Sequence, residues 1–335
     1  MKNIFKAAAL LAAVLMLFCV TGCGDNAGGT PAEPPFVANE TPLTLEAIQA
    51  GTITLTNPWP TLKYKKNGSE LVGVTASANT IAVAAGDKIA FYAGGSDNTY
   101  DSSTDTVTAL RIRCSSDFYV YGNVMSLLSS SDFKNATSIS TEYALAHLFD
   151  GNNHIKNHSQ KALVLPATTL AASCYSSMFS GCTSLTSAPA LPATTLEDSD
   201  YCYFGMFSGC TSLTSAPALP ATTLSLFCYS SMFAGCTSLT STPVLPAMTL
   251  AAYCYMGMFI NCSSLNSVTC LATEISETGC TAGWLYNVAS SGTFTKASSM
   301  STRDINTSGE GWILNSSDYG IPTNWTVQNY SAPQQ

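Results

Sequence analysis

The sequence predicts an α+β fold in which an N-terminal β-sandwich-like domain is followed by a repeat array and a C-terminal cap. Short alternating runs bounded by turn residues lie between about Pro42 and Leu128, which is typical of strands. Farther along, one segment recurs at intervals of 28, 26 and 26 residues, and the recurrence fades after Gly283. A period of this length predicts stacked units that bury their apolar faces against one another.

The first residues are typical of an exported bacterial lipoprotein. Lys2 and Lys6 precede an apolar run from Ala7 to Val20, which is shorter than the roughly 20 residues that a membrane span needs. The run ends in Val-Thr-Gly-Cys, which resembles a lipobox, so residues 1–22 are expected to be a signal peptide and Cys23 the lipidated first mature residue. The alternative is an ordinary secretory peptide with an incidental cysteine. We expect a lipid-anchored protein of the bacterial cell envelope, exposed on the outer membrane, that contacts membrane through its anchor only.

Residues 23–41 are rich in Gly, Pro and Asn and are expected to form a flexible tether. Residues 42–135 are expected to form the β-rich, sandwich-like domain. Asn67-Gly68 stands between two alternating runs and predicts a hairpin, and Ala85-Gly86-Asp87 predicts a second turn.

The repeat array is expected to cover residues 145–279 in about five units. Four clear copies begin at Cys174, Cys202, Cys228 and Cys254, and a weaker copy before them is expected to cap the array. Residues 280–335, which contain Trp284, Trp312 and Trp325, are expected to cover its other end.

Each unit resembles the repeat of the BspA-like leucine-rich-repeat bacterial surface proteins. In the first full copy the matching residues are Met178-Phe179, Cys182, Leu185 and Pro192. The resemblance implies a short leucine-rich-repeat solenoid and attachment to host or neighbouring-cell molecules. One departure is a second proline, Pro189 in this copy, where the family strand would lie. Either the strands are only a few residues long or the proline nitrogens point away from the neighbouring coil.

The cysteines of the repeats are expected to form a structural ladder of buried thiols. If the intervening segment is helical, two cysteines eight residues apart are separated by about 12 Å, too far for a disulfide. Bridging between stacked coils remains an alternative, since coil spacing is roughly 4.8 Å. Without Cys19 and Cys23 eleven cysteines remain, and an odd number cannot all pair. The two recurring sets are Cys174, Cys202, Cys228 and Cys254, and Cys182, Cys210, Cys236 and Cys262.

Charge and motifs exclude several classes of function. Removal of residues 1–22 changes the formal net charge from -8 to -10, and there is no Lys or Arg between Lys161 and Lys296, so nucleic acid is not expected as a partner. No enzymatic signature, cofactor motif or metal-ligand cluster appears, and we expect a protein that is not an enzyme. Weaker alternatives are a metal on His154 and His158, Ca²⁺ on the acidic insertion at 197–200, and catalysis by Asp97, Asp101 and Asp105.

The expected function is adhesion or protein recognition at the cell surface through one face of the repeats. The alternative is a carbohydrate-binding accessory lipoprotein, in which tyrosines stack on sugar rings or the sandwich-like domain is the binding module. The partner would be an extracellular protein or a glycan. Four tyrosines at equivalent positions are the candidate binding face: Tyr175, Tyr203, Tyr229 and Tyr255.

Overall fold

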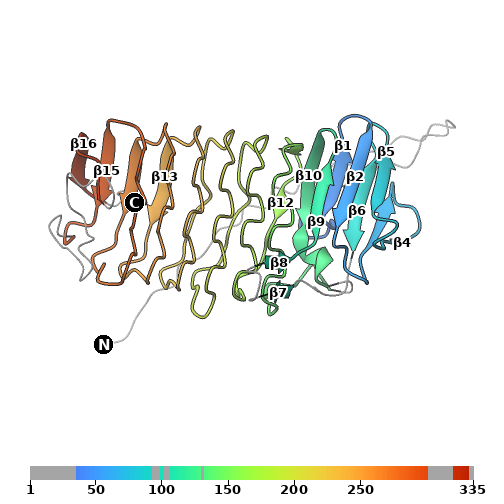
Figure 1. Ribbon diagram of the computed structural model, residues 1–335, viewed down its shortest axis with the longest axis horizontal. Helices are drawn as coiled ribbons and strands as arrows, with labels where there is room; N and C mark the ends of the chain where they lie inside the picture. The colour runs from blue at the N-terminus through green and yellow to red at the C-terminus, as the bar shows by residue number, and fades with distance from the viewer. Residues whose placement is uncertain (1–34, 93–98, 102–105, 130–131, 301–319, 332–335) are drawn as a thin grey trace, which may run out of the picture. The chain divides into compact units, whose positions relative to one another are not determined.

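The computed structural model describes residues 35–92, 99–101, 106–129, 132–300 and 320–331 (Figure 1). Phe36–Gln335 forms one compact unit. The expected signal peptide, the lipidation candidate Cys23 and residues 23–34 of the tether lie outside the described residues. Within the described part of the chain, no helix combines the length and the apolar character that a membrane crossing requires.

The N-terminal strands form two main sheets. A seven-stranded sheet has the order β11-β10-β1-β6-β3-β4, with β12 also paired to β10, and a three-stranded sheet has the order β5-β2-β9. Strand β10 pairs antiparallel with β1 but parallel with β11 and β12, so the larger sheet continues into the first coil of the repeats. The strands are β1 (Thr44–Ala47), β2 (Gly51–Thr56), β3 (Lys63–Lys66), β4 (Val72–Gly73), β5 (Thr80–Val83), β6 (Lys88–Tyr92), β7 (Thr99–Asp101), β8 (Thr106–Thr108), β9 (Arg111–Cys114), β10 (Phe118–Asn123), β11 (Ile155–Asn157) and β12 (Leu163–Val164).

The two turns predicted in this region are both present. Asn67 and Gly68 have a left-handed backbone, with φ angles of 52° and 74°. They join the antiparallel strands β3 and β4. Gly86, with φ of 84°, lies between β5 and β6. Because β5 and β6 belong to different sheets, this turn carries the chain from one sheet to the other.

The predicted α+β class and its leucine-rich-repeat solenoid are wrong. The described residues contain several sheets and one short 3-10 helix, η1 (Val124–Leu127), but no α-helix. The segment from Cys174 to Cys182, for which a helix was considered in the argument about cysteine spacing, is a run of turns. Its backbone is left-handed at Ser173, Ser177 and Gly181, with φ of 55°, 52° and 69°, and a left-handed residue in every fourth position prevents a right-handed helix.

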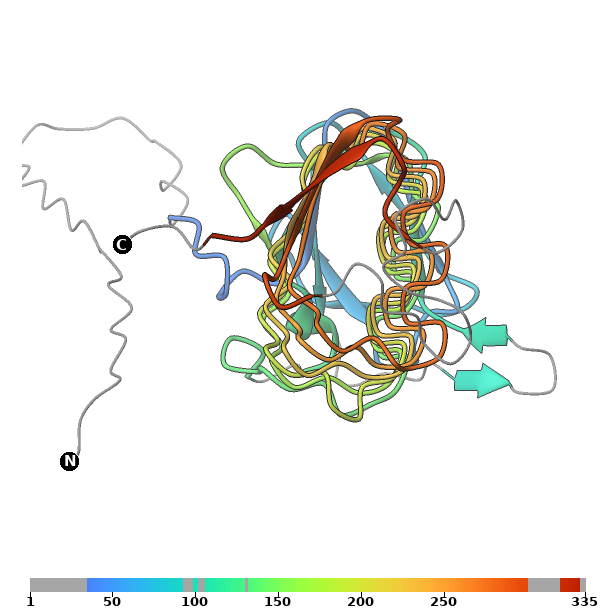
Figure 2. The ribbon, with the colours of Figure 1, turned by 90° about the vertical axis from the view of Figure 1, so that its left-hand side faces the viewer.

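Backbone hydrogen bonds explain how these turns stack. Alternate N–H groups donate within their own turn, as from Ser176 to the carbonyl of Ser173 at 3.1 Å. The others donate to the next coil, as from Tyr175 to the carbonyl of Cys202 at 3.0 Å and from Ser177 to that of Phe204 at 2.8 Å. The same alternation recurs in each coil, so the turn segment satisfies its backbone both locally and between coils. Figure 2 shows the turns of successive coils superposed on one side and the strand segments on the other.

Strand pairing on the other side is limited by proline. Coils that contain Pro189 and Pro217 are joined there by single bridges, such as that between Ser187 and Ser215, and not by ladders. A continuous parallel sheet begins only at β13, which shows a register shift between Ser241 and Val244, on either side of Pro243. Short strand contacts, the first of the two alternatives, therefore apply in the proline-containing coils. The sheet has the order β13 (Ser241–Leu245), β14 (Ser267–Cys270), β15 (Gly292–Lys296) and β16 (Trp325–Asn329).

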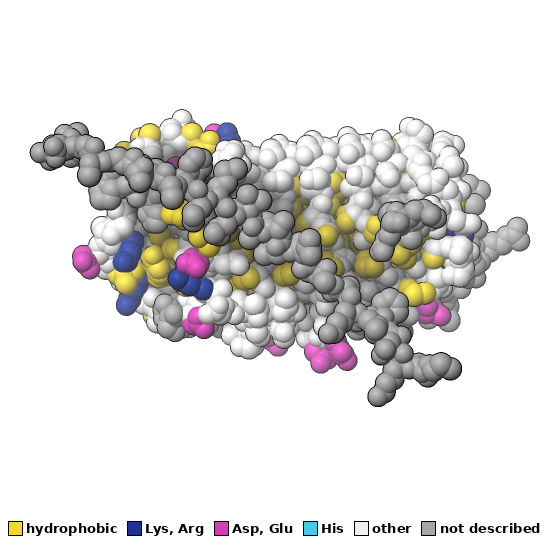
Figure 3. Space-filling view, turned by 180° about the vertical axis from the view of Figure 1, so that it is seen from behind, with side chains coloured by type: hydrophobic (Ala, Val, Ile, Leu, Met, Phe, Trp, Pro, Cys, Tyr) yellow, Lys and Arg dark blue, Asp and Glu magenta, His cyan; other side chains and the backbone are white. Residues whose placement is uncertain are grey.

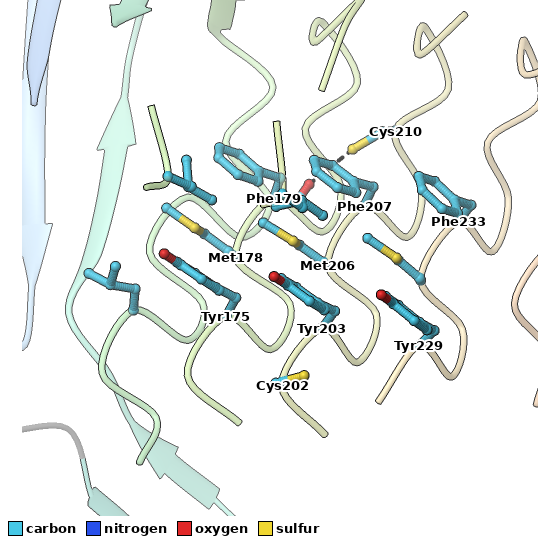
Figure 4. Close-up of a cluster of buried hydrophobic side chains, with 14 of the residues drawn as sticks. Tyr175, Met178, Phe179, Cys202, Tyr203, Met206, Phe207, Cys210, Tyr229 and Phe233 are labelled. Atoms are coloured by element: carbon cyan, nitrogen blue, oxygen red, sulfur yellow. Dashed lines mark hydrogen bonds between the residues drawn. The ribbon is translucent and has the colours of Figure 1, made fainter. Parts of the chain in front are cut away.

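The core consists of rows of identical side chains that run through the coils (Figure 4). Phe207 stacks between Phe179 and Phe233, with ring centroids 5.5 and 5.7 Å apart and rings within 8° of parallel. Met206 and Leu213 of the same coil are fully buried, as are their equivalents in the neighbouring coils. The buried residues form one continuous cluster from the N-terminal sheets to Trp325.

The recurrence continues one coil beyond Gly283. The N–H of Tyr255 donates to the carbonyl of Cys280 and that of Phe259 to the carbonyl of Trp284, both at 2.9 Å, in the register of the earlier coils. Trp284 thus occupies the position of a methionine. Trp325 follows in β16, where its indole N–H donates to the carbonyl of Ala289 at 2.8 Å. Trp312 lies outside the described residues.

Candidate functional site

The four tyrosines that were expected to form a binding face lie in the core. The exposed fractions of Tyr175, Tyr203, Tyr229 and Tyr255 are 1%, 1%, 2% and 1%. Their rings stack between coils, as Tyr203 does on Tyr229 at 5.6 Å, and burial raises the pKa of each hydroxyl. A ring that packs against two neighbouring coils cannot stack on a sugar or contact a partner, so this assignment is wrong.

The eight recurrent cysteines are fully buried and free. In the second set each thiol donates to the backbone carbonyl of a phenylalanine in the preceding coil: Cys182 to Phe149 and Cys210 to Phe179, both at 3.1 Å. Cys236 and Cys262 repeat this contact at 3.1 and 3.0 Å. These thiols therefore connect consecutive coils through weak hydrogen bonds, without disulfides.

Burial also makes the thiols unreactive. All eleven described cysteines are free and buried. Desolvation raises the pKa of Cys210, Cys228 and Cys262 to about 12, and the pKa of Cys182 lies well above its ordinary value for the same reason. Since the thiolate is the nucleophile and the metal ligand, neither nucleophilic catalysis nor metal binding is supported at these positions.

The strand side of the coils presents the most regular exposed surface, which we call the strand-side face. Thr186, Thr214 and Thr240 are exposed at equivalent positions of three coils. Four residues later in each coil, a small apolar side chain is also exposed: Ala190, Ala218 and Val244, the last at 39%. Figure 3 shows this side: hydrophobic side chains form a band along the coils, uncharged residues flank it, and most charged side chains gather near the N-terminal sheets. The repeats thus present a long uncharged face with a mildly apolar centre.

An open groove of about 700 Å³ lies at one end of this face, between the first and second coils. Its apolar lining includes Val120, Leu163, Pro166, Ala188 and Pro192. The groove exists because the first coil is longer: Asn152 and Leu165 are thirteen positions apart, whereas their equivalents in the second coil are nine apart. The extra residues lie between β11 and β12. This difference in spacing is visible in the sequence, but no groove was predicted from it.

Asn157 closes the gap in backbone pairing at the start of the groove. Its side-chain oxygen accepts from the N–H groups of Thr186 and Ser187 at 2.9 and 3.0 Å, and its amide donates to the carbonyl of Ser187 at 2.9 Å. The Asn157 side chain therefore makes hydrogen bonds with the backbone of the second coil that a neighbouring strand would otherwise make.

A polar cluster lies at the rim of the groove. The Lys161 ammonium is 2.9 Å from a Glu46 oxygen and 4.5 Å from the centroid of Tyr121. Burial opposes ionisation of Glu46, but hydrogen bonds from Lys161 and Tyr121 outweigh it and lower the pKa of that carboxyl. Desolvation and nearby Lys161 lower the pKa of His158, whose Nδ1 accepts from the N–H of Gln160. The charges of Lys161 and Glu46 thus compensate each other, so the groove has an apolar lining with little net charge at its rim.

The alternative chemistry considered from the sequence finds no geometric support. His154 contacts Asp117 at 3.1 Å while His158 packs against Tyr119, so the two histidines face different neighbours. Among the residues that the structure describes, no group of three or more His, Cys, Asp or Glu side chains could hold a metal ion. Asp97 and Asp105 lie outside the described residues, and the side chain of Asp101 is also not described.

Comparisons with known proteins give no further guidance. No protein-family model matches the chain, and neither a curated protein nor a solved structure shows significant similarity to it.

Proposed function

We propose that the protein is a lipid-anchored component of the bacterial cell envelope that binds extracellular macromolecules along the strand-side face of its coils. One observation carries the proposal: equivalent uncharged side chains are exposed in the same place in successive coils, next to an open groove. A repeated surface of this kind suits an extended partner, because each coil offers the same contact again. The anchor at Cys23 and the surface location rest on the N-terminal sequence alone.

Protein recognition is the better candidate of the two binding functions. A glycan-binding site normally offers aromatic faces to sugar rings, but the four recurrent tyrosines are buried and the strand-side face is built from threonine, alanine and valine. The strand-side face has Ala190, Ala218 and Val244 in its exposed centre, and small apolar side chains flanked by hydroxyl groups fit an extended polypeptide. Adhesion to host or neighbouring cells is the corresponding biological role.

Binding of the mature chain to a panel of extracellular-matrix proteins, cell surfaces and glycans tests the proposal. Charged side chains placed in the apolar centre, A218E combined with V244E, should abolish binding to the protein or cell ligand. T237E is the matched control, since Thr237 is exposed at the end of the turn segment, away from the strand side. Equal binding by both variants, or binding to glycans alone, would refute the proposal.

A further inference from the structure

A second exposed feature lies where each coil enters its turns. Three aromatic side chains of consecutive coils stack there: Tyr201 on Phe227 with centroids 4.7 Å apart, and Phe227 on Tyr253 with centroids 4.6 Å apart. These rings, which we call the aromatic ladder, are closer together than the buried phenylalanines. Tyr201 at its end is 36% exposed, and the other two are partly exposed.

The backbone does not require aromatic residues in the aromatic ladder. Tyr201, Phe227 and Tyr253 have left-handed φ angles of 56°, 53° and 54°. Gly279, which occupies the equivalent position in the next coil, has φ of 61° and adopts this conformation without steric cost. Bulky side chains at such a position are strained, and strain of this kind is commonly retained where a surface has a function.

Carboxylates precede the exposed end of the ladder in the chain. Burial raises the pKa of Tyr201, and one of these carboxylates, Asp200, lies close enough to raise it further. The second full repeat is two residues longer than the next ones, and the additional length brings Glu197 and Asp198 into the loop before Tyr201. Both are exposed, and within the described ranges no cation pairs with them. Asp200 is different, because its Oδ1 accepts from the N–H of Leu226 at 3.1 Å and stabilises the next coil.

The coils of the aromatic ladder supply no cation to these carboxylates. The sequence has no Lys or Arg between Lys161 and Lys296, which includes every coil of the aromatic ladder. A partner that contacts Tyr201 therefore meets carboxylates near an aromatic ring, with no competing cation from these coils.

We propose that the aromatic ladder and the carboxylates of Glu197 and Asp198 form a docking site for an arginine-containing basic segment of a partner protein. A guanidinium group is planar, stacks on aromatic rings and pairs with carboxylates in a bidentate manner, and Glu197 and Asp198 lie within four residues of Tyr201 in the chain. A lysine ammonium can use the charge but stacks less well. This inference rests on the proposed function, because it specifies the chemistry of a protein partner.

Fluorescence anisotropy with the mature chain and two labelled peptides tests the site. The peptides are equal in length and net charge, and one alternates Gly with Arg where the other alternates Gly with Lys. The arginine peptide should bind more tightly by about two- to fivefold, and Y201S should remove that preference, since an exposed cation-π contact is worth about that factor. E197Q combined with D198N should weaken both peptides and reduce the salt dependence of binding.

Controls separate docking from folding and from the strand-side face. Y201F keeps the ring and should bind as the unmodified chain does, and Y286S removes another exposed tyrosine, 46% exposed, without effect. Equal affinity for the two peptides, or unchanged binding by Y201S or by E197Q/D198N, would overturn the inference. If these variants bind normally while A218E/V244E loses its ligand, the docking site fails and the proposed function stands.

Discussion

This protein should unfold at only mildly alkaline pH, because so many of its thiols are buried. Burial raises the pKa of Cys114, Cys210, Cys228, Cys262 and Cys270 from 9.0 to about 12. It also raises the pKa of five further thiols, those of Cys174, Cys182, Cys202, Cys236 and Cys254. A group whose pKa is higher in the folded state contributes its full stability below the unfolded value. That contribution is lost as the pH rises from about 9 toward the folded value, since only the unfolded chain releases its protons.

The size of the effect follows from the number of thiols. Between pH 8 and pH 9 an unfolded thiol with its ordinary pKa of 9.0 gains roughly 0.35 kcal/mol from ionisation, and ten such thiols lower the free energy of unfolding by about 3.5 kcal/mol. By pH 10 the total reaches about 14 kcal/mol, which is as large as the whole stability of a typical domain. We therefore expect cooperative unfolding between pH 9 and pH 10.

Urea unfolding of the mature chain, measured by circular dichroism in the presence of a reductant at pH 8 and pH 9, gives both values. Replacement of Cys182, Cys210, Cys236 and Cys262 by alanine leaves six of these ten thiols, so the loss between the two pH values should fall to about 2 kcal/mol. We expect that variant to be less stable at both pH values. The test is the change in its free energy of unfolding between pH 8 and pH 9, compared with that of the unmodified chain. A folded protein at pH 11 whose thiols titrate near their ordinary pKa would refute the reasoning.

Three comparisons test the packing of the coils. F207L should lower the free energy of unfolding by about 1–3 kcal/mol and F259L by about half of that, because Phe207 stacks on two rings and Phe259 on one. Equal losses of the two variants in urea unfolding would count against the stacking contribution. Y203F should raise the melting temperature, since the hydroxyl of Tyr203 is buried without a hydrogen-bond partner and such a group costs about 1–3 kcal/mol; a lower melting temperature would mean that the hydroxyl is satisfied. G209A should cost about 1–2 kcal/mol because φ is 73°, whereas G73A, at a position with open space and no positive φ, should be neutral by the same measurement.

Stacking of the repeats was predictable from the sequence, but the internal structure of each coil was not. Identical segments at a fixed period require equivalent residues to lie against one another, which the rows of Phe and Met satisfy. The turn segment, however, has apolar residues at helix-like spacing, as in Tyr175, Met178 and Phe179, and this favours a helix. The left-handed positions that break it carry Ser177 or Tyr201 as well as Gly181, so the usual glycine signal is incomplete.

The candidate surfaces illustrate the same limit. Cys174 and Tyr175 are neighbours in sequence, and in a strand or at the edge of a helix one of the two would face solvent. In a run of turns both side chains point inward, which is why tyrosines that recur at a surface-like position are buried. The aromatic residues that stack near the surface are Tyr201, Phe227 and Tyr253, each two positions before a buried tyrosine. Ser173 in one coil and Gly279 in another conceal this pattern. By contrast, the acidic insertion before Tyr201 was visible as two additional residues in an otherwise constant period.

The thiols connect this architecture to the conditions under which the chain folds. In the folded state they are buried and protonated, so the native protein resists oxidation. The unfolded chain has no such protection: its eleven thiols regain an ordinary pKa and lie on a flexible polymer, where any two can meet. Since adjacent coils are linked by thiol-to-carbonyl contacts such as that from Cys210 to Phe179, a disulfide formed before folding would prevent two rungs of the ladder from assembling. Packing must therefore precede oxidation for this chain to fold, which favours folding in a reducing or anaerobic setting.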